Sequence, residues 1–335
     1  MRDDLIQPRP EGLYCPAGRF YVDPLLPVAR AVVTHAHGDH ARAGNAQYEV
    51  AAAGIGLMRE RLGTVAAIAT HDWGEPFTLG EVKVSFHPSG HILGAAQVRM
   101  EHAGHVLVVS GDYKRESDPT CAAFEPVLCD TFVTESTFAL PVYRWPPMAQ
   151  VMDELLAWWD DCARRKVPAL LFCYALGKAQ RILAELALRT TRTVYLHGAM
   201  LQLVERYREA GVDMLPTVPV AESVRGDGLA GELVLAPPSA AGSLWMRRFS
   251  KASTAFASGW MRIRGNRRRR GYDRGFVISD HADWPGLLRS IDDSQANRIL
   301  VTHGDGDALI RFLCEQGRDA RPLRDRDTTA SGHRG

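Results

Sequence analysis

The six cysteines of this sequence, at positions 15, 121, 129, 162, 173 and 314, include no Cys-x-x-Cys pair. They suggest neither a zinc ribbon nor a disulfide framework, and they favour a reducing compartment. The sequence also lacks the run of about 20 apolar residues that a membrane span needs, and its first residues lack the apolar segment of a secretion signal. These absences predict a cytoplasmic protein with no membrane partner.

Net charge is also nearly absent, because 40 Lys and Arg residues oppose 39 Asp and Glu residues and leave +1 at pH 7. A chain-wide positive field that attracts nucleic acid is therefore excluded. Positive charge is concentrated locally in the run Arg267, Arg268, Arg269 and Arg270. This run either follows a phosphate backbone or forms a solvated loop.

The 335 residues are enough for two domains, and the sequence shows two different patterns of predicted secondary structure. Residues 13–112 contain short apolar runs between turn residues and predict two packed sheets. After Pro141, helices are expected at 147–166, 177–188 and 199–210 and strands at 167–173 and 193–196, an alternation typical of a parallel sheet covered by helices. Strand signals return at 275–278 and 298–302, and the charged tail from about 317 is expected to be flexible.

The most informative feature is a hexapeptide at 35–40 with three histidines and one aspartate, which follows a predicted strand at 31–34. His35 and His37 are two residues apart, so at a strand end they can point the same way. Asp39 and His40 follow a glycine, which lets the chain turn and direct a second pair of side chains elsewhere. Imidazole and carboxylate groups are ligands for zinc or manganese, so the pattern predicts a metal centre. The alternative is a surface histidine cluster.

Four other ionisable residues lie just past predicted strands: Asp23, His91, Asp112 and His303. A strand end that opens onto a glycine-bearing loop is a common place for an active site, because a rigid scaffold directs the side chain. Each residue alone is equally consistent with a turn or a helix cap. Together with the hexapeptide, they predict a site for two metal ions.

These motifs resemble those of the metallo-β-lactamase-fold nucleases of the β-CASP group. The hexapeptide matches the metal motif of the group, and 90–94 and 110–112 match the next two motifs. Residues 134–137 match the acidic motif that opens an inserted domain, and 279–283 and 301–304 match the closing motifs. The segments 12–18, 259–262 and 280–284 most specifically resemble the bacterial ligase-associated DNA exonuclease family.

The resemblance implies an α/β fold in which an inserted β-CASP α/β domain interrupts a metallo-β-lactamase αββα sandwich. The expected division is residues 1–140 for the first part of the lactamase-like domain and 141–271 for the insert. Residues 272–316 would close the lactamase-like domain, and 317–335 would form the tail.

The resemblance also assigns two divalent ions, Zn²⁺ or Mn²⁺, to seven side chains: His35, His37 and His91 for one ion, Asp39, His40 and His303 for the other, and Asp112 bridging both. Two such ions can activate a water and hold a phosphodiester for in-line attack, a reaction in which Asp39 and Asp112 would take part. Asp23 would orient a ligand histidine rather than bind metal.

His281 is the candidate general acid, with Glu135 holding it in the useful tautomer. The alternative for His281 is a residue that caps the following helix. Phosphate contacts are expected from Ser136, Thr137, Lys178 and the arginines at 267–270, although Lys178 could equally be a solvated lysine at a helix start.

The resulting hypothesis is a two-metal-dependent DNA nuclease, a single-strand exonuclease that acts in DNA repair alongside a DNA ligase and a helicase. His303 is usual in RNA-acting members of the group, whereas Tyr174 to Lys178 resembles a segment of DNA cross-link repair nucleases. An RNA-processing ribonuclease is therefore the first alternative, and a small-molecule metallo-hydrolase is the second. The polarity of digestion, the exo or endo mode, the physiological metal and the oligomeric state are left open.

Overall fold

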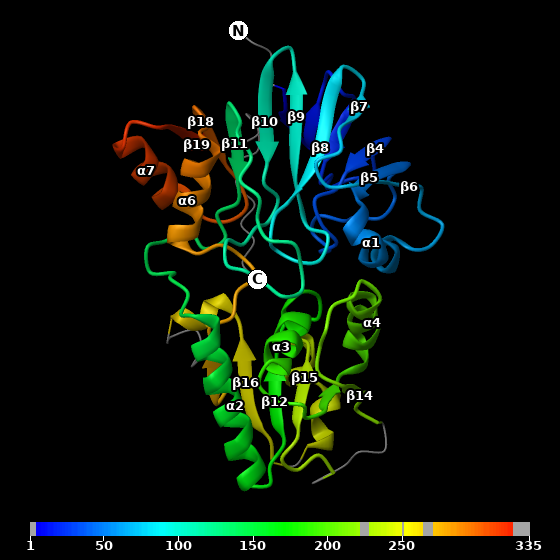
Figure 1. The fold of residues 1–335 in the computed structure, drawn as a ribbon, viewed down its shortest axis with the longest axis vertical. Helices are drawn as coiled ribbons and strands as arrows, with labels where there is room; N and C mark the ends of the chain where they lie inside the picture. The colour runs from blue at the N-terminus through cyan, green and yellow to red at the C-terminus, as the bar shows by residue number, and fades with distance from the viewer. Residues whose placement is uncertain (1–4, 222–227, 250, 264–270, 324–335) are drawn as a thin grey trace.

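The computed structural model describes residues 5–221, 228–249, 251–263 and 271–323. Its upper lobe in Figure 1 contains two sheets. The first has the order β1 (Gln7–Arg9), β2 (Gly12–Cys15), β3 (Phe20–Val22), β4 (Arg30–Val32), β5 (Gln47–Ala51) and β6 (Ile68–His71). The second has the order β19 (Asp319–Pro322), β18 (Arg298–Val301), β11 (Thr131–Thr134), β10 (His105–Val109), β9 (Ala96–His102), β8 (Val82–Pro88) and β7 (Phe77–Leu79).

The two sheets share one apolar core, in which Phe20 and Val32 of the first sheet join Val84 and Val98 of the second. Alternate residues of each strand face this core, as expected for strands that are buried on one face. Residues of α1 (Ile55–Leu62) pack on the first sheet, and residues of α6 (Trp284–Ser294) and α7 (Asp307–Glu315) pack on the second. The expected α/β class is confirmed, with the layers helix, sheet, sheet and helix.

A third sheet fills the lower lobe of Figure 1 and is parallel throughout. Its order is β14 (Thr217–Pro219), β13 (Val194–Leu196), β15 (Leu233–Ala236), β12 (Ala169–Phe172), β16 (Ser253–Ala257) and β17 (Arg274–Phe276). A core that includes Trp159, Ile182 and Leu235 joins it to α2 (Met148–Arg164), α3 (Lys178–Ala187) and α4 (Leu201–Glu209). The alternation of strands and helices after residue 141 therefore produces the parallel sheet that it predicts.

Two segments differ from the expectation. The strand β17 extends the third sheet just beyond the boundary expected at 271, and the domain limits stay a prediction. The expectation of a flexible tail from 317 is wrong for β19, which pairs in parallel with β18, with Ala320 buried under α7. Short 3-10 helices lie at Ala52–Gly54, Gly198–Met200, Pro238–Ala240, Leu244–Arg248 and Gly259–Arg262.

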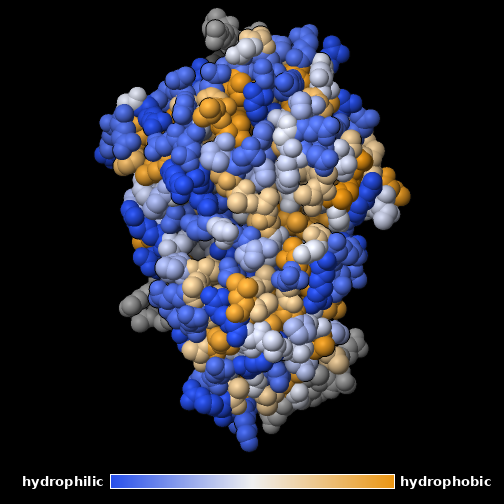
Figure 2. All heavy atoms as spheres, viewed as in Figure 1, coloured by the Kyte–Doolittle hydropathy of each residue, from blue (hydrophilic) through white to orange (hydrophobic). Residues whose placement is uncertain are grey.

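The junction between the lobes is where the site residues gather. The chain leaves the ends of the parallel strands β10 and β11 toward the lower lobe, and α3 lies at this junction (Figure 1). In Figure 2, hydrophilic residues cover much of both lobes on this face, and hydrophobic residues gather along its middle. Within the described ranges, none of the helices has the length and apolar character needed to cross a membrane.

Gly94 offers a test of how tightly the loop after β8 is packed. Its φ is +72°, and a Cβ on it would overlap the backbone of Gly54. Gly94→Ala should therefore lower the melting temperature, because overpacking of this kind costs about 1–3 kcal/mol in addition to the backbone strain of Ala at positive φ.

Gly104→Ala is the matched control. Its φ of +76° imposes the same backbone strain, but its added Cβ would have no neighbour within 4 Å. Equal losses of melting temperature in the two variants would contradict the packing described for Gly94.

Candidate metal centre

Three histidine rings converge at the junction of the lobes. The Nδ1 atom of His37 lies 3.0 Å from His35 Nε2 and 3.0 Å from His91 Nε2. His35 and His37 follow β4, and His91 lies in the loop between β8 and β9. Together with Asp112, which follows β10, they offer four ligand atoms that all lie within 4.8 Å of one another. The strand ends thus bring together residues that are up to 77 positions apart in the sequence.

The protonation state of these three rings suits the binding of a cation. Burial lowers the pKa of His35 and His91 well below the usual value, and it lowers the pKa of His37 as well. The rings are therefore neutral near pH 7 and offer lone pairs. Neutral imidazole nitrogens that face one another beside a carboxylate are a donor set that fits Zn²⁺ or Mn²⁺.

Asp112 lies at the centre of the group. Its Oδ2 atom is 3.5 Å from His40 Nε2, 3.6 Å from His35 Nε2 and 3.7 Å from His91 Nε2. Burial raises the pKa of Asp112, but the surrounding imidazoles, with His40 first, lower it well below its usual value. The carboxylate is thus ionised and lies between the first three rings and His40.

Asp23 lies where it can orient the ring of His40. Its Oδ2 accepts a hydrogen bond from His40 Nδ1 at 2.7 Å, and its two oxygens also accept from the amide and hydroxyl of Thr34. Although burial lowers the pKa of His40, the carboxylates of Asp23 and Asp112 raise it well above the usual value. The Nε2 atom of His40 is buried and lacks a hydrogen-bond partner among the described residues, and it would have to release its proton to bind a metal ion.

The other two ligands expected for the second ion lie at the surface. Asp39 is 67% exposed, and its Oδ2 lies 3.8 Å from His40 Nε2. The ring of His303, which is also exposed, stacks on the ring of His40 with 5.0 Å between centroids. Neither belongs to the compact groups of ligand atoms found in the part of the chain that the structure describes. The second set is therefore looser and more open to solvent than the first.

Glu135 and His281 form a pair beside Asp112. Glu135 Oε2 accepts a hydrogen bond from His281 Nδ1 at 2.8 Å, and its Oε1 accepts from the Tyr113 amide. Burial lowers the pKa of His281, but Glu135 and Asp112 outweigh it and raise this pKa to about 9. The side chain of His281 is 21% exposed, so its other nitrogen can reach a bound molecule. The alternative of a helix cap does not hold, because the side chain of Asp283 caps α6.

The residues expected to contact phosphate are not brought together in the same way. Ser136 is buried and donates its hydroxyl to the carbonyls of Thr302 and His303. Thr137 is half-buried beside it. Lys178 is buried and pairs with Asp280 at 3.0 Å, which argues against both a phosphate contact and a solvated lysine. The arginines at 267–270 lie outside the described residues.

Two backbone carbonyls that contact the outward-facing nitrogens of His37 and His91 were not predicted from the sequence. The carbonyl of Leu176 lies 3.3 Å from His37 Nε2, and the carbonyl of Asp280 lies 2.7 Å from His91 Nδ1. Backbone carbonyls leave no residue-type signal, so the sequence could not reveal them. A buried ion network of Lys114, Asp118 and Arg181 behind them was also missed.

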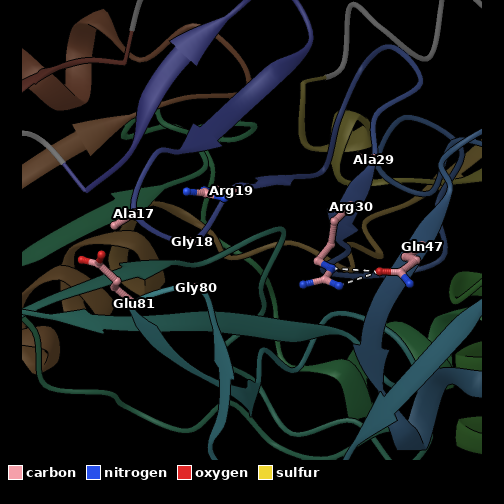
Figure 3. Close-up of a pocket in the computed structure, with 8 residues that line it drawn as sticks. All are labelled: Ala17, Gly18, Arg19, Ala29, Arg30, Gln47, Gly80 and Glu81. Carbon is pink, nitrogen blue, oxygen red and sulfur yellow. Dashed lines mark hydrogen bonds between the residues drawn. The ribbon is translucent and has the colours of Figure 1, made fainter.

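One surface hollow adjoins this centre and a second lies away from it. One of about 640 Å³ is lined by His303 and by the loop between β18 and α7, and so adjoins the open side of the site. The other, shown in Figure 3, lies between Arg19, Arg30, Gln47 and Glu81. There Arg30 donates two hydrogen bonds to Gln47, and none of the expected ligands lines the hollow.

Several known proteins are similar to this chain in sequence. No family model matches the chain. A probable DNA ligase of Opitutus terrae is 31% identical over 314 residues, which cover 92% of this chain and 30% of that protein. Endoribonuclease YSH1 of Gibberella zeae is 28% identical over 43% of this chain and 18% of its own length. Cleavage and polyadenylation specificity factor subunit 3 of Dictyostelium discoideum is 31% identical over 30% of this chain and 13% of its own length.

The chain thus spans less than a third of the length of these relatives. Two of these three relatives are named for activity on nucleic acids, one as a probable DNA ligase and one as an endoribonuclease. A crystal structure of a protein of unknown function from Enterococcus faecalis V583 shares the fold, with a TM-score of 0.56 and 12% identity over 82% of this chain and 75% of that chain.

The pair formed by Glu135 and His281 can be tested in the metal-free protein. Glu135→Gln removes the largest contribution that raises the His281 pKa, so an NMR titration should show this pKa falling clearly below about 9. Glu125→Gln is the control, since Glu125 contacts His87 instead. An unchanged His281 pKa in Glu135→Gln would show that the carboxylate does not govern this ring.

Proposed function

We propose that the chain is a two-metal-dependent nuclease with a metallo-β-lactamase sandwich and a β-CASP insert. The observation that carries the proposal is the position of Asp112, which lies between three neutral histidines on one side and His40 on the other. Zn²⁺ or Mn²⁺ would be held there by His35, His37, His91 and Asp112 in one site, and by Asp39, His40, His303 and the same Asp112 in the other. The two sheets with outer helices and the separate parallel sheet support this fold.

When bound, two such ions would lower the pKa of a shared water and neutralise a phosphodiester. The residues of the chain supply the remaining tasks. Asp23 fixes the ring of His40 through its Nδ1 atom, and the ionised Asp112 keeps the two ligand sets together. His281 is protonated near neutral pH and holds its Nδ1 proton toward Glu135. Its other nitrogen is therefore directed to donate a proton to the leaving oxygen.

The proposed substrate is DNA, degraded as a single strand from an end, in a repair role alongside a DNA ligase and a helicase. The counterpart of nearly the whole chain lies within a protein named a probable DNA ligase, whereas the endoribonuclease match covers less than half of the chain. The arginines at 267–270 remain proposed backbone contacts. A cytoplasmic location also remains a prediction.

An RNA-processing ribonuclease is the second candidate, since the relatives named endoribonucleases also match and His303 is present. A hydrolase of small thioesters or lactams is disfavoured, because it would need neither the pair of Glu135 and His281 nor the lower lobe.

Substrate choice is tested by incubating one preparation with end-labelled single-stranded DNA, RNA of the same sequence and a generic thioester, each with Mn²⁺ or Zn²⁺. We expect DNA to be shortened from one end in a metal-dependent reaction, with RNA much slower and the thioester unchanged. Cleavage of RNA with DNA intact would contradict the choice of DNA and favour the ribonuclease.

Metal binding and proton transfer are separated by two variants. Asp112→Ala should lose both bound metal and hydrolysis, because two cations without a bridging carboxylate repel each other. His281→Ala should keep its metal and lose rate by about 10²–10⁴-fold, the usual contribution of a general acid. Metal content is measured by elemental analysis of the dialysed proteins. Full metal content and activity in Asp112→Ala would refute the assigned centre, and an unchanged rate in His281→Ala would remove its proposed role.

A further inference from the structure

Two of the ligand histidines depend on carbonyl groups that come from distant segments. His37 donates its Nε2 proton to the carbonyl of Leu176, which lies between β12 and α3 in the lower lobe. His91 donates its Nδ1 proton to the carbonyl of Asp280, between β17 and α6. Since a carbonyl only accepts, each contact fixes the tautomer and leaves the inward nitrogen unprotonated. The inward atoms are His37 Nδ1 and His91 Nε2, which lie 3.0 Å apart.

One buried ion pair joins the two carbonyl-bearing segments. Lys178 opens α3 two residues after Leu176, and its ammonium lies 3.0 Å from Asp280 Oδ2, with both side chains only 5% exposed. Removing one partner of a buried pair is costly, because it leaves the other charge uncompensated. The pair therefore holds the start of α3 against residue 280.

Neighbouring contacts make this connection rigid. Gly177 has a φ of +87°, its amide donates to Gln180, and a Cβ on it would overlap the side chain of Ile92, the residue after His91. Arg181, one turn further along α3, donates to the Ser279 carbonyl at 2.6 Å. The same helix start thus contacts both the His91 loop and the segment that carries the Asp280 carbonyl.

We propose that Lys178 is a positioning residue for the metal centre: its ion pair with Asp280 holds the two carbonyls that orient His37 and His91. The inference rests on the proposed function, since it presupposes the metal centre. Lys178 does not itself touch the ligand atoms. Through this ion pair, the lower lobe would help to build the metal site in addition to any contact that it makes with substrate.

The sign of the effect on metal affinity distinguishes this role from simple electrostatics. Deleting a positive charge near a cation site should by itself strengthen metal binding. Loss of orientation should weaken it, and loss of an outer partner of a ligand histidine typically costs about 10–100-fold in metal affinity. Lys178→Met should therefore weaken Zn²⁺ binding by about 10–100-fold in a chelator competition assay, and Lys178→Arg should restore most of the affinity.

Arg192→Met is the matched control. Like Lys178, which pairs with Asp280 and lies over the Tyr174 ring, Arg192 pairs with Asp160 and lies over the Trp159 ring, but its pair joins α2 to the loop before β13. It should leave Zn²⁺ affinity unchanged. A second readout is the ¹⁵N spectrum of the metal-free protein, in which His91 should be protonated at Nδ1 in the unmodified chain and in a mixture of tautomers in Lys178→Met.

The outcomes separate this inference from the proposed function. If the unmodified protein binds no metal, the proposed function fails. If it binds two ions and Lys178→Met binds them equally well or more tightly, with His91 unchanged, only the positioning role is overturned. Should Lys178→Met not fold, Asp280→Asn removes the ion pair but keeps the carbonyl, and an unchanged His91 tautomer there would equally overturn the proposal.

Discussion

The structure depends on the crowding of four imidazole rings around one buried carboxylate, Asp112. Burial keeps His35, His37 and His91 neutral, while the imidazoles of His40 and His281, whose pKa values are raised, keep Asp112 ionised. The nitrogens of these histidines that face one another lie 3.0 Å apart. They cannot hydrogen-bond to one another when the protons of the rings are on the outward-facing nitrogens. A cation shared among them removes this conflict, which is the physical reason for reading the cluster as a metal centre.

The two lobes contribute differently to that centre. The candidate ligands lie on loops at the strand ends of the upper lobe, where β4 and β10 direct them. The groups that hydrogen-bond the outward-facing nitrogens come partly from the same lobe, as Asp23 does for His40. The others are the carbonyl of Leu176 in the lower lobe and the carbonyl of Asp280 in the segment between β17 and α6. The proposed positioning role of the lower lobe accounts for the burial of charged residues such as Lys178 and Asp280 at the junction.

Much of the site could be predicted from the sequence, because its ligands carry distinctive side chains at strand ends. The hexapeptide and the strand-end positions of Asp23 and Asp112 follow from residue type and spacing, whereas the orienting role of Asp23 is what the resemblance to the β-CASP nucleases implies. Lys178 could not be understood in this way, since a lysine at a helix start looks solvated until its partner, 102 positions later, is placed beside it. For the fold, periodicity predicted the parallel sheet, but β19 was missed because four residues with exposed charges carry little apolar signal.

The most direct test of the central claim is anomalous diffraction from crystals soaked in Mn²⁺ or Zn²⁺. The account predicts two peaks on either side of the Asp112 carboxylate, about 3.5–4 Å apart as in other two-metal sites. One peak should lie among His35, His37 and His91, and the other beside His40. The absence of both peaks, with metal bound only elsewhere in the molecule, would contradict the metal centre and the nuclease chemistry proposed for it.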